Sequence, residues 1–362
     1  MMSTSILFTG YAPVHFLCFR PIYERLSRRT DIEVFVSGGL RSSIGDGFAY
    51  DGAGLYNPFG VPDERILSVE AIQSRRFDVL VSANKRIIAP RENFGTLIQI
   101  FHGVSLRNRA VRRETLDYDV LFLIGPYMLR KFVERGLLTE NDRRGVAIGF
   151  PKTDPLVSRC IDRTGLLGRY GFDGSRPVVL YAPTGEAHNS LETMGEEVIR
   201  RLAACDNLDL LIKPHDHPKN RIDWQKALSS LEGPHTRLVR DHDVTPLLML
   251  SDALITDASS VANEYTLLDR PIVFLDVHEL LRVSLESGAA LDDHDWDRKG
   301  GVVVDRPADV ADAVLEALAD GDRLSHVRRA IAQDLFYNPG CATEAALDWI
   351  AQRFLSSDRR AS

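Results

Sequence analysis

Residues 241–269 read DHDVTPLLMLSDALITDASSVANEYTLLD and decide the fold of this chain. An apolar run over 253–255 ends in Thr256-Asp257-Ala258-Ser259-Ser260, and a helical pattern of apolar residues begins at Val261. A strand that ends in small hydroxyl residues and leads directly into a helix is typical of parallel α/β sheets. The first turn of such a helix carries unsatisfied N–H groups and partial positive charge, so this segment predicts an anion site.

Two interpretations of this turn stay open. In the first, Asp257, Ser259 and Ser260 hold the phosphates of an activated nucleotide donor, because two hydroxyl donors lie beside the helix N-terminus. In the second, one of the serines only caps the helix, which is a common role of serine. Glu264, one turn into the helix, is either a ligand of a ribose hydroxyl or a solvated surface carboxylate.

Short apolar runs alternate with amphipathic runs along the whole chain, which predicts parallel sheets built from right-handed βαβ units. The expected strands lack polar alternation, as they do when both faces of a sheet are covered. The expected strands are 5–9, 32–36, 79–82, 97–101, 120–124, 146–148, 178–181, 210–212, 237–239, 253–256, 272–275 and 301–304, and expected helices include 14–28, 193–205, 244–250 and 310–319.

The chain has 362 residues, which is enough for two domains. The Gly- and Pro-rich segment GFPKTDPL at 149–156 separates two sets of strands, so we expect an acceptor-side domain at 1–157 and a nucleotide-donor domain at 158–362, with a helix at 343–354 crossing back to the first. Two doubly wound, Rossmann-like α/β domains facing each other across a cleft form the GT-B architecture. Ligands of such sheets bind beyond the carboxyl ends of the strands.

Composition restricts the class of protein. Hydrophobic residues make up 44% and charged residues 26%, which is the balance of a soluble globular protein, and the net charge of −7 lacks the basic excess that a nucleic-acid partner requires. The cysteines at 18, 160, 205 and 341 are far apart and favour a reducing compartment. The sequence shows no signal peptide and no apolar run of transmembrane length, so we expect a cytoplasmic protein.

Two features at the end of the expected strand 97–101 suggest chemistry. His102 followed by Gly103 places an imidazole at a sharp turn, where it can take a proton from an attacking hydroxyl, although a histidine satisfied by a nearby carbonyl is an alternative. The basic run RNRAVRR follows at 107–113, and Arg107 and Arg109 are expected to bind an anionic acceptor or part of the donor. A solvated charged face is the alternative for this run.

Two strand ends of the second half also carry polar side chains. Thr184 follows the strand 178–181 and is expected to meet a phosphate or a ribose, with plain turn chemistry as the alternative. Lys213 and His215 follow the strand 210–212 and are expected to face a diphosphate. His215 and His217 also suggest a metal site, but no third or fourth ligand follows, so no bound metal and no other cofactor are expected.

Taken together, these segments resemble the CDP-glycerol glycerophosphotransferase family, the teichoic-acid primases and polymerases. The resemblance covers about residues 95–280, and the last of its segments is the most specific. The matching segments are FHGVSL (101–106), GFPKTD (149–154), YAPT (181–184), KPHDHP (213–218) and the long segment 243–271.

The resemblance implies a GT-B fold and transfer of phosphoglycerol, or a related phospho-alditol, from a CDP-activated donor to a hydroxyl of a cell-envelope polysaccharide or lipid-linked acceptor, with release of CMP. By motif position, His102 matches the proposed base of the family and His215 its second catalytic histidine. Asp257, Ser259 and Ser260 match its donor-phosphate loop.

The chain also departs from the family pattern, and these departures leave the transferred alcohol open. Phe101 stands where tryptophan is common, Ala258 replaces a usual tyrosine, Gly185-Glu186 follow YAPT, and Asp216-His217 lengthen the KPHP-like segment. A different CDP-linked alcohol, a GT-B nucleotide-sugar enzyme (a glycosyltransferase or a UDP-sugar 2-epimerase) and a non-catalytic nucleotide-binding partner of an envelope complex remain alternatives. For a membrane-borne acceptor we expect peripheral membrane contact through 107–113 or through a basic and apolar face at 19–29, with packing on a core as the alternative for that face. No pattern indicates the oligomeric state.

Overall fold

The computed structural model describes residues 3–45, 47–84, 86–104, 110–158, 161–215, 222–286, 296 and 298–355. The chain divides into two compact units. The first contains Met1–Gly103, Ala110–Asp154 and Leu335–Ser362, and the second contains Val104 and Pro155–Asp334.

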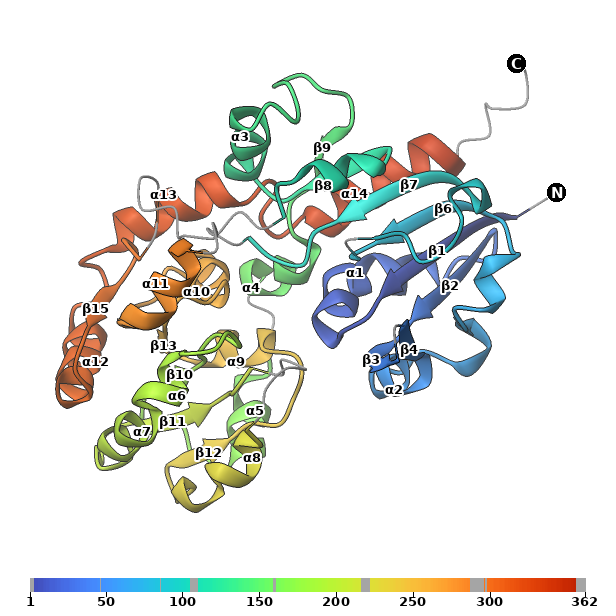
Figure 1. Ribbon diagram of the computed structural model, residues 1–362. Coiled ribbons are helices and arrows are strands. Elements are labelled where there is room, and N and C mark those ends of the chain that lie inside the picture. The colour runs from blue at the N-terminus through green and yellow to red at the C-terminus, as the bar shows by residue number, and fades with distance from the viewer. Residues whose placement is uncertain are drawn as a thin grey trace. The chain divides into compact units, whose positions relative to one another are not determined.

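Within its described residues, the first unit contains a seven-stranded parallel sheet in the order β5-β2-β1-β6-β7-β8-β9. This is the doubly wound order, in which the chain reverses direction across the sheet between β1 and β6. Figure 1 shows the strands of this sheet except β5 with their labels. The strands are β1 (Thr4–Gly10), β2 (Ile32–Gly38), β5 (Ile66–Leu67), β6 (Phe77–Ser82), β7 (Phe94–Ile100), β8 (Val120–Leu123) and β9 (Gly145–Ala147).

Two helices far apart in sequence cover one face of this sheet. Helix α1 (Pro13–Leu26) begins with proline at its first position, where the missing N–H costs no hydrogen bond. Its Phe16 and Phe19 share a core with Phe8 of β1 and with Ile350 of α14 (Ala342–Ile350), so the C-terminal helix belongs to the first unit. The other helices of this unit are α2 (Gly52–Tyr56), α3 (Pro126–Glu134) and α4 (Asp154–Ser158), which continues into the second unit.

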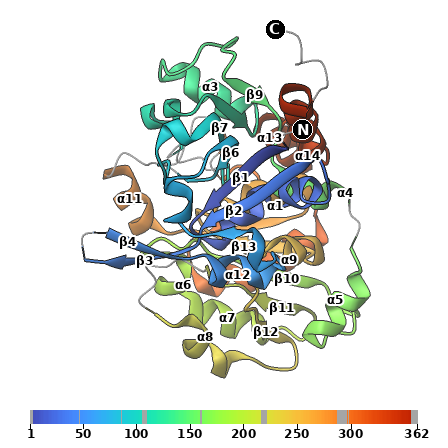
Figure 2. The ribbon, with the colours of Figure 1, turned by 90° about the vertical axis from the view of Figure 1, so that its right-hand side faces the viewer.

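An antiparallel hairpin, β3 (Leu40–Ile44) and β4 (Gly47–Asp51), follows β2 and was not expected from the sequence. Figure 2 shows it extending outward from the strands of the first unit. Every described residue of β3 is exposed, so its side chains form no buried apolar run of the kind that identified the other strands.

Within its described residues, the second unit contains a six-stranded parallel sheet in the order β12-β11-β10-β13-β14-β15, again doubly wound, with its reversal between β10 and β13. Apolar cores lie on both of its faces, which explains the uninterrupted apolar strands. The strands are β10 (Val178–Tyr181), β11 (Asp209–Ile212), β12 (Thr236–Leu238), β13 (Ala253–Thr256), β14 (Ile272–Leu275) and β15 (Val302–Val304).

The helices of the second unit alternate with these strands; one helix precedes the first strand and two follow the last (Figure 1). They are α5 (Arg163–Tyr170), α6 (Ser190–Thr193), α7 (Gly195–Ala203), α8 (Trp224–Ala227), α9 (Thr245–Leu250), α10 (Val261–Tyr265), α11 (His278–Glu286), α12 (Val310–Ala319) and α13 (Ser325–Leu335). The expected alternation of strands and helices is confirmed. Among the described residues, no helix is both long enough and apolar enough to cross a bilayer.

Candidate functional site

His102 follows β7 at the carboxyl edge of the first sheet, and its side chain is exposed. Its imidazole lies 4.8 Å, centroid to centroid, from the imidazole of His15, with the ring planes tilted by 41°. His15 lies in α1, directly after the first strand, and is only 3% exposed. The carboxyl edge of this sheet therefore joins a buried histidine to an exposed one, where the exposed ring can exchange a proton with a ligand.

The backbone around β1 fixes the position of His15. The N–H of Tyr11 donates a hydrogen bond to Nδ1 of His15 at 3.3 Å, which leaves that nitrogen unprotonated. The Tyr11 and His15 rings also meet edge to face at 4.2 Å. A Cβ on Gly10 would come within 2.9 Å of the His15 Cβ, so the absence of a side chain at position 10 allows this close approach.

Positive charge surrounds the same strand end. The Arg41 guanidinium of β3 stacks over the Tyr11 ring at 4.2 Å. Burial raises the pKa of the Tyr11 phenol, and the charges of Arg41 and Arg112 act in the opposite direction. Tyr11 therefore stays a neutral hydroxyl at physiological pH, and the arginines give this edge a local positive potential that suits an anionic ligand.

Three further polar side chains lie near the carboxyl ends of β2, β1 and β6. The hydroxyls of Ser37 and Thr9, which are paired in register, and the amide of Asn84 are buried and have no hydrogen-bond partner among the described residues. Sequence analysis did not single them out, nor Tyr11, His15 and Arg41. The sequence feature that could have identified these residues is the short connection from β1 to α1, because ligands of doubly wound sheets bind at such connections.

In the second unit, the Asp257 carboxylate joins the ends of two adjacent strands. Asp257 follows β13 and is fully buried. Its Oδ1 accepts the Thr184 N–H at 2.8 Å, and its Oδ2 accepts the N–H and the hydroxyl of Ser190 at 3.0 and 2.9 Å. These bonds hold the loop after β10 across the reversal point of the sheet. Asp257 thus fixes the backbone of Thr184, a contact that sequence analysis did not anticipate.

The two serines begin helix α10. Ser260 takes the N-cap position, but its side chain makes no capping hydrogen bond, which disfavours capping as the role of that hydroxyl. Because α10 has only five residues, its macrodipole is smaller than the sequence analysis assumed. Any affinity of this turn for an anion therefore depends more on the serine hydroxyls and the backbone N–H groups. Glu264 is 1% exposed, so the interpretation as a solvated surface carboxylate is wrong.

Lys213 and His215 follow β11, the strand beside β10. The Lys213 N–H bonds to the Tyr181 carbonyl at 2.9 Å, which extends the parallel pairing by one residue. Lys213 is 6% exposed and its Nζ donates to the Pro214 carbonyl at 2.9 Å, whereas His215 is exposed. Lys213, His215, Thr184 and Ser259 thus lie at the carboxyl ends of three neighbouring strands of one sheet.

The segment GFPKTD connects the first unit to its C-terminal helix. Gly149 has a φ of +98°, and a Cβ there would collide with the Tyr337 carbonyl oxygen. Asp154 accepts the N–H groups of Ala342 and Thr343 at 3.0 and 2.8 Å and so caps α14. These contacts favour a structural role of the segment.

Other predicted positions lie outside the described residues, namely Arg107, Arg109 and His217. Gly103 is described and lies partly buried directly after His102. Where the structure describes the chain, no group of three His, Cys, Asp or Glu side chains is arranged to hold a metal ion.

Comparison with known proteins identifies the family of this chain. A family model described as CDP-glycerol:poly(glycerophosphate) glycerophosphotransferase matches residues 78–338. The teichoic acid poly(glycerol phosphate) polymerase of Staphylococcus epidermidis is 28% identical over 209 residues, which are 49% of this chain and 28% of that protein. The teichoic acid glycerol-phosphate transferase of Staphylococcus aureus is 24% identical over 248 residues, or 64% of this chain and 59% of that protein.

The chain therefore spans less than two thirds of the length of these curated relatives. Among solved structures, the wall teichoic acid polymerase TagF has a TM-score of 0.71 at 20% identity, covering 97% of this chain and 89% of that one. At this identity the likeness concerns the fold, and it confirms the expected GT-B-like class of two Rossmann-like α/β units.

Proposed function

Because the chain belongs to the CDP-glycerol:poly(glycerophosphate) glycerophosphotransferase family, we propose that it transfers phosphoglycerol, or a related phospho-alditol, from a CDP-activated donor to a hydroxyl acceptor. The acceptor is a cell-envelope polysaccharide or a lipid-linked sugar. The observation that carries the proposal is the family match over residues 78–338, which includes both histidine segments and the serine turn.

In the proposed reaction, His102 takes the proton of the acceptor hydroxyl. The hydroxyl oxygen then attacks the phosphorus that bears the alditol, a new P–O bond forms, and the bond from that phosphorus to the bridging oxygen breaks. CMP leaves with the bridging oxygen. His102 is suited to the role of base because its ring is exposed and is packed against a buried neighbour.

Polar groups of the second unit are assigned to the donor. Lys213, His215 and the hydroxyls of Ser259 and Ser260 stabilise charge on the phosphoryl oxygens and on the leaving CMP, with Thr184 and Glu264 as further donor contacts. Gly103 of the first unit is also assigned to the donor. Asp257 positions Thr184. Arg107 and Arg109 are assigned to the acceptor.

The test is release of CMP from a panel of CDP-alcohols, with and without acceptor, in the wild type and in His102→Ala. We expect His102→Ala to lose at least about 100-fold in kcat, the lower end of general-base contributions, with unchanged thermal unfolding because the side chain is exposed. His326→Ala, which removes an exposed histidine of α13, is the matched control. Near-normal turnover of His102→Ala would contradict the assignment.

The names of the curated relatives describe polymerisation and transfer of teichoic acid units, so the nucleotide-sugar alternative is not favoured. Product analysis with UDP-sugars in place of CDP-alcohols tests it directly. Action in the cytoplasm, with peripheral contact to the inner face of the membrane, stays a prediction.

A further inference from the structure

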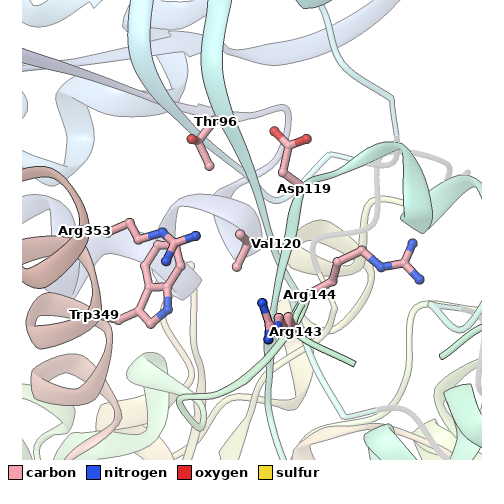
Figure 3. Close-up of a pocket in the computed structure, with 7 residues that line it drawn as sticks. All are labelled: Thr96, Asp119, Val120, Arg143, Arg144, Trp349 and Arg353. Atoms are coloured by element: carbon pink, nitrogen blue, oxygen red, sulfur yellow. The ribbon is translucent and has the colours of Figure 1, made fainter. Parts of the chain in front are cut away.

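A basic pocket lies at the amino-terminal edge of the first sheet, the edge opposite to His102 (Figure 3). Its volume is about 480 Å³. The residues that precede or begin β7, β8 and β9 form one wall, and the C-terminal helix forms the other. The lining residues are Thr96, Asp119, Val120, Arg143, Arg144, Trp349 and Arg353.

The charges of the lining do not cancel. Asp119 is paired with Arg91 at 2.7 Å, and Arg144 is paired with Asp142 at 2.7 Å. Arg143 and Arg353 remain, and neither forms an ion pair with any residue that the structure describes. Two uncompensated guanidinium groups in one pocket create a local positive potential in a chain whose net charge is −7.

Trp349 holds one of these charges in place. The Arg353 guanidinium lies 5.9 Å from the centre of the Trp349 ring, and Figure 3 shows the two side by side, with Arg144 extending away from them. Trp349 in turn packs edge to face on Phe122 of β8 at 5.3 Å and joins the apolar core of the sheet. The Arg353 guanidinium therefore rests against a side chain that is fixed by the core. This contact lowers the conformational entropy that Arg353 loses when it binds an anion.

We propose that this pocket binds a phosphodiester group of a polyol phosphate chain, at a unit of the acceptor remote from the reacting hydroxyl. The proposal rests on the proposed function, because each transfer of a phospho-alditol unit to a hydroxyl leaves a phosphodiester on the acceptor. Guanidinium groups match phosphate oxygens in charge and in hydrogen-bond geometry. Six residues of nearly extended chain separate Thr96 from His102, or about 20 Å at the rise of a strand, so a group bound here is not the group that reacts.

Other anions fit the pocket less well. A nucleotide base that stacks on Trp349 would compete with Arg353, whose guanidinium already lies 5.9 Å from the centre of that ring. A bilayer would need exposed apolar side chains around the rim, but no lining residue belongs to the exposed large hydrophobic residues of the described chain. A flexible chain of polyols and single phosphate charges makes neither demand.

A second binding point makes the acceptor bivalent. Once one unit of the chain occupies the pocket, its end is held at a high effective concentration near the first unit, so long acceptors bind better than short ones. The expected signature is a dependence of the acceptor KM on length that disappears when the pocket loses its charges.

The test compares Arg143→Ala/Arg353→Ala with the wild type and with Arg323→Ala, a control that removes one exposed arginine from the second unit. Binding of a poly(glycerol phosphate) oligomer is measured by calorimetry at low salt, beside CMP, inorganic phosphate and anionic vesicles. We expect oligomer affinity to fall at least about tenfold in the double variant, which corresponds to about 1.4 kcal/mol, and to stay unchanged in the control. The same binding measurement is made on Arg143→Glu. This variant reverses one charge of the pocket and leaves the contact between Arg353 and Trp349 in place.

Kinetics give the second readout. The double variant should raise KM for a long acceptor about tenfold and leave kcat and the KM of a single-unit acceptor unchanged. An unchanged oligomer affinity, an equal rise of both KM values, or a loss of CMP or vesicle binding in place of oligomer binding would overturn the proposal. Binding needs no turnover, so a wild type that binds the oligomer through these arginines but releases no CMP contradicts the proposed function and leaves the pocket assignment standing.

Discussion

The rings of His15 and His102 lie 4.8 Å apart, although 86 positions separate them in the sequence. His15 is buried and bonded to the Tyr11 N–H, whereas His102 is exposed. The buried ring of His15 limits the orientations that the exposed ring of His102 can take. We infer that His15 is a positioning residue for the proposed base.

This inference predicts a split between the kinetic constants. His15→Ala should lower kcat about tenfold, because His102 loses the surface that orients it, and should leave the donor KM unchanged. His15→Phe restores a ring of similar size at the same place and should recover most of kcat. If His15 has a purely structural role, the kcat of both variants should change only in proportion to their loss of thermal stability. A wild-type kcat in His15→Ala would exclude the positioning role.

Asp257 offers a test of the donor loop. Asp257→Asn replaces one carboxylate oxygen, which accepts hydrogen bonds from Thr184 or Ser190, with an NH₂ donor. The free energy of unfolding should fall by about 2 kcal/mol, and the donor KM should rise about tenfold as the loop after β10 loosens.

The matched control is Asp252→Asn. Asp252 lies before the same strand β13, where its carboxylate accepts the Val178 N–H at 2.8 Å and pairs with Arg163 at 2.8 Å. Both variants remove a partly or fully buried carboxylate, but only Asp257 lies at the carboxyl edge. Equal effects of the two variants on donor KM, measured as initial rates of CMP release, would refute a specific role of Asp257.

Most of the fold was predictable because buried parallel strands have continuous apolar sequences. Ala253–Thr256 and Ile272–Leu275 agree residue for residue with the expected strands. The hairpin of β3 and β4 was missed because its exposed strands carry no such run. The expected helix 193–205 corresponds to α7, which begins only at Gly195 because Met194 has a non-helical φ of −145°, and the short helix α6 precedes it.

The candidate site was predictable where a strand end and a chemical side chain coincide, as at His102 and Ser259. It was not predictable where the partners come from elements that sequence order does not relate. His15 reaches His102 only because β1 and β7 both flank β6, and Asp257 reaches Thr184 only because β13 lies beside β10. These two contacts depend on the order of the strands in each sheet, and the local pattern of apolar and polar residues carries no information about that order.

Asp154 predicts a pH dependence of stability. Burial raises the pKa of this carboxyl above its usual value of 3.8, against the two N–H groups of α14 that favour the charged form. A raised pKa means that the folded state binds the proton more tightly than the unfolded state. The stabilising contribution is therefore complete below the usual pKa and is lost as the pH rises through the raised value.

Asp154→Asn removes this titration. The free energy of unfolding of the wild type minus that of Asp154→Asn should thus fall as the pH rises from the usual carboxyl pKa through the raised one, measured by urea denaturation at fixed ionic strength. Asp154→Ala also loses the cap of α14, so its free energy of unfolding should be about 1 kcal/mol lower than that of Asp154→Asn at every pH. A difference that rises with pH would show that the hydrogen bonds outweigh burial.

Ser260 separates capping from phosphate binding, the two interpretations that the sequence left open. A capping serine costs about 1 kcal/mol when it is replaced by alanine. The Ser260 hydroxyl makes no capping bond, so Ser260→Ala should change the free energy of unfolding by less than about 0.5 kcal/mol. If the hydroxyl binds a donor phosphate, the same variant should raise the donor KM about tenfold. Thermal unfolding and CMP-release kinetics on one preparation measure both quantities, and a loss of stability with an unchanged KM would return Ser260 to the role of a cap.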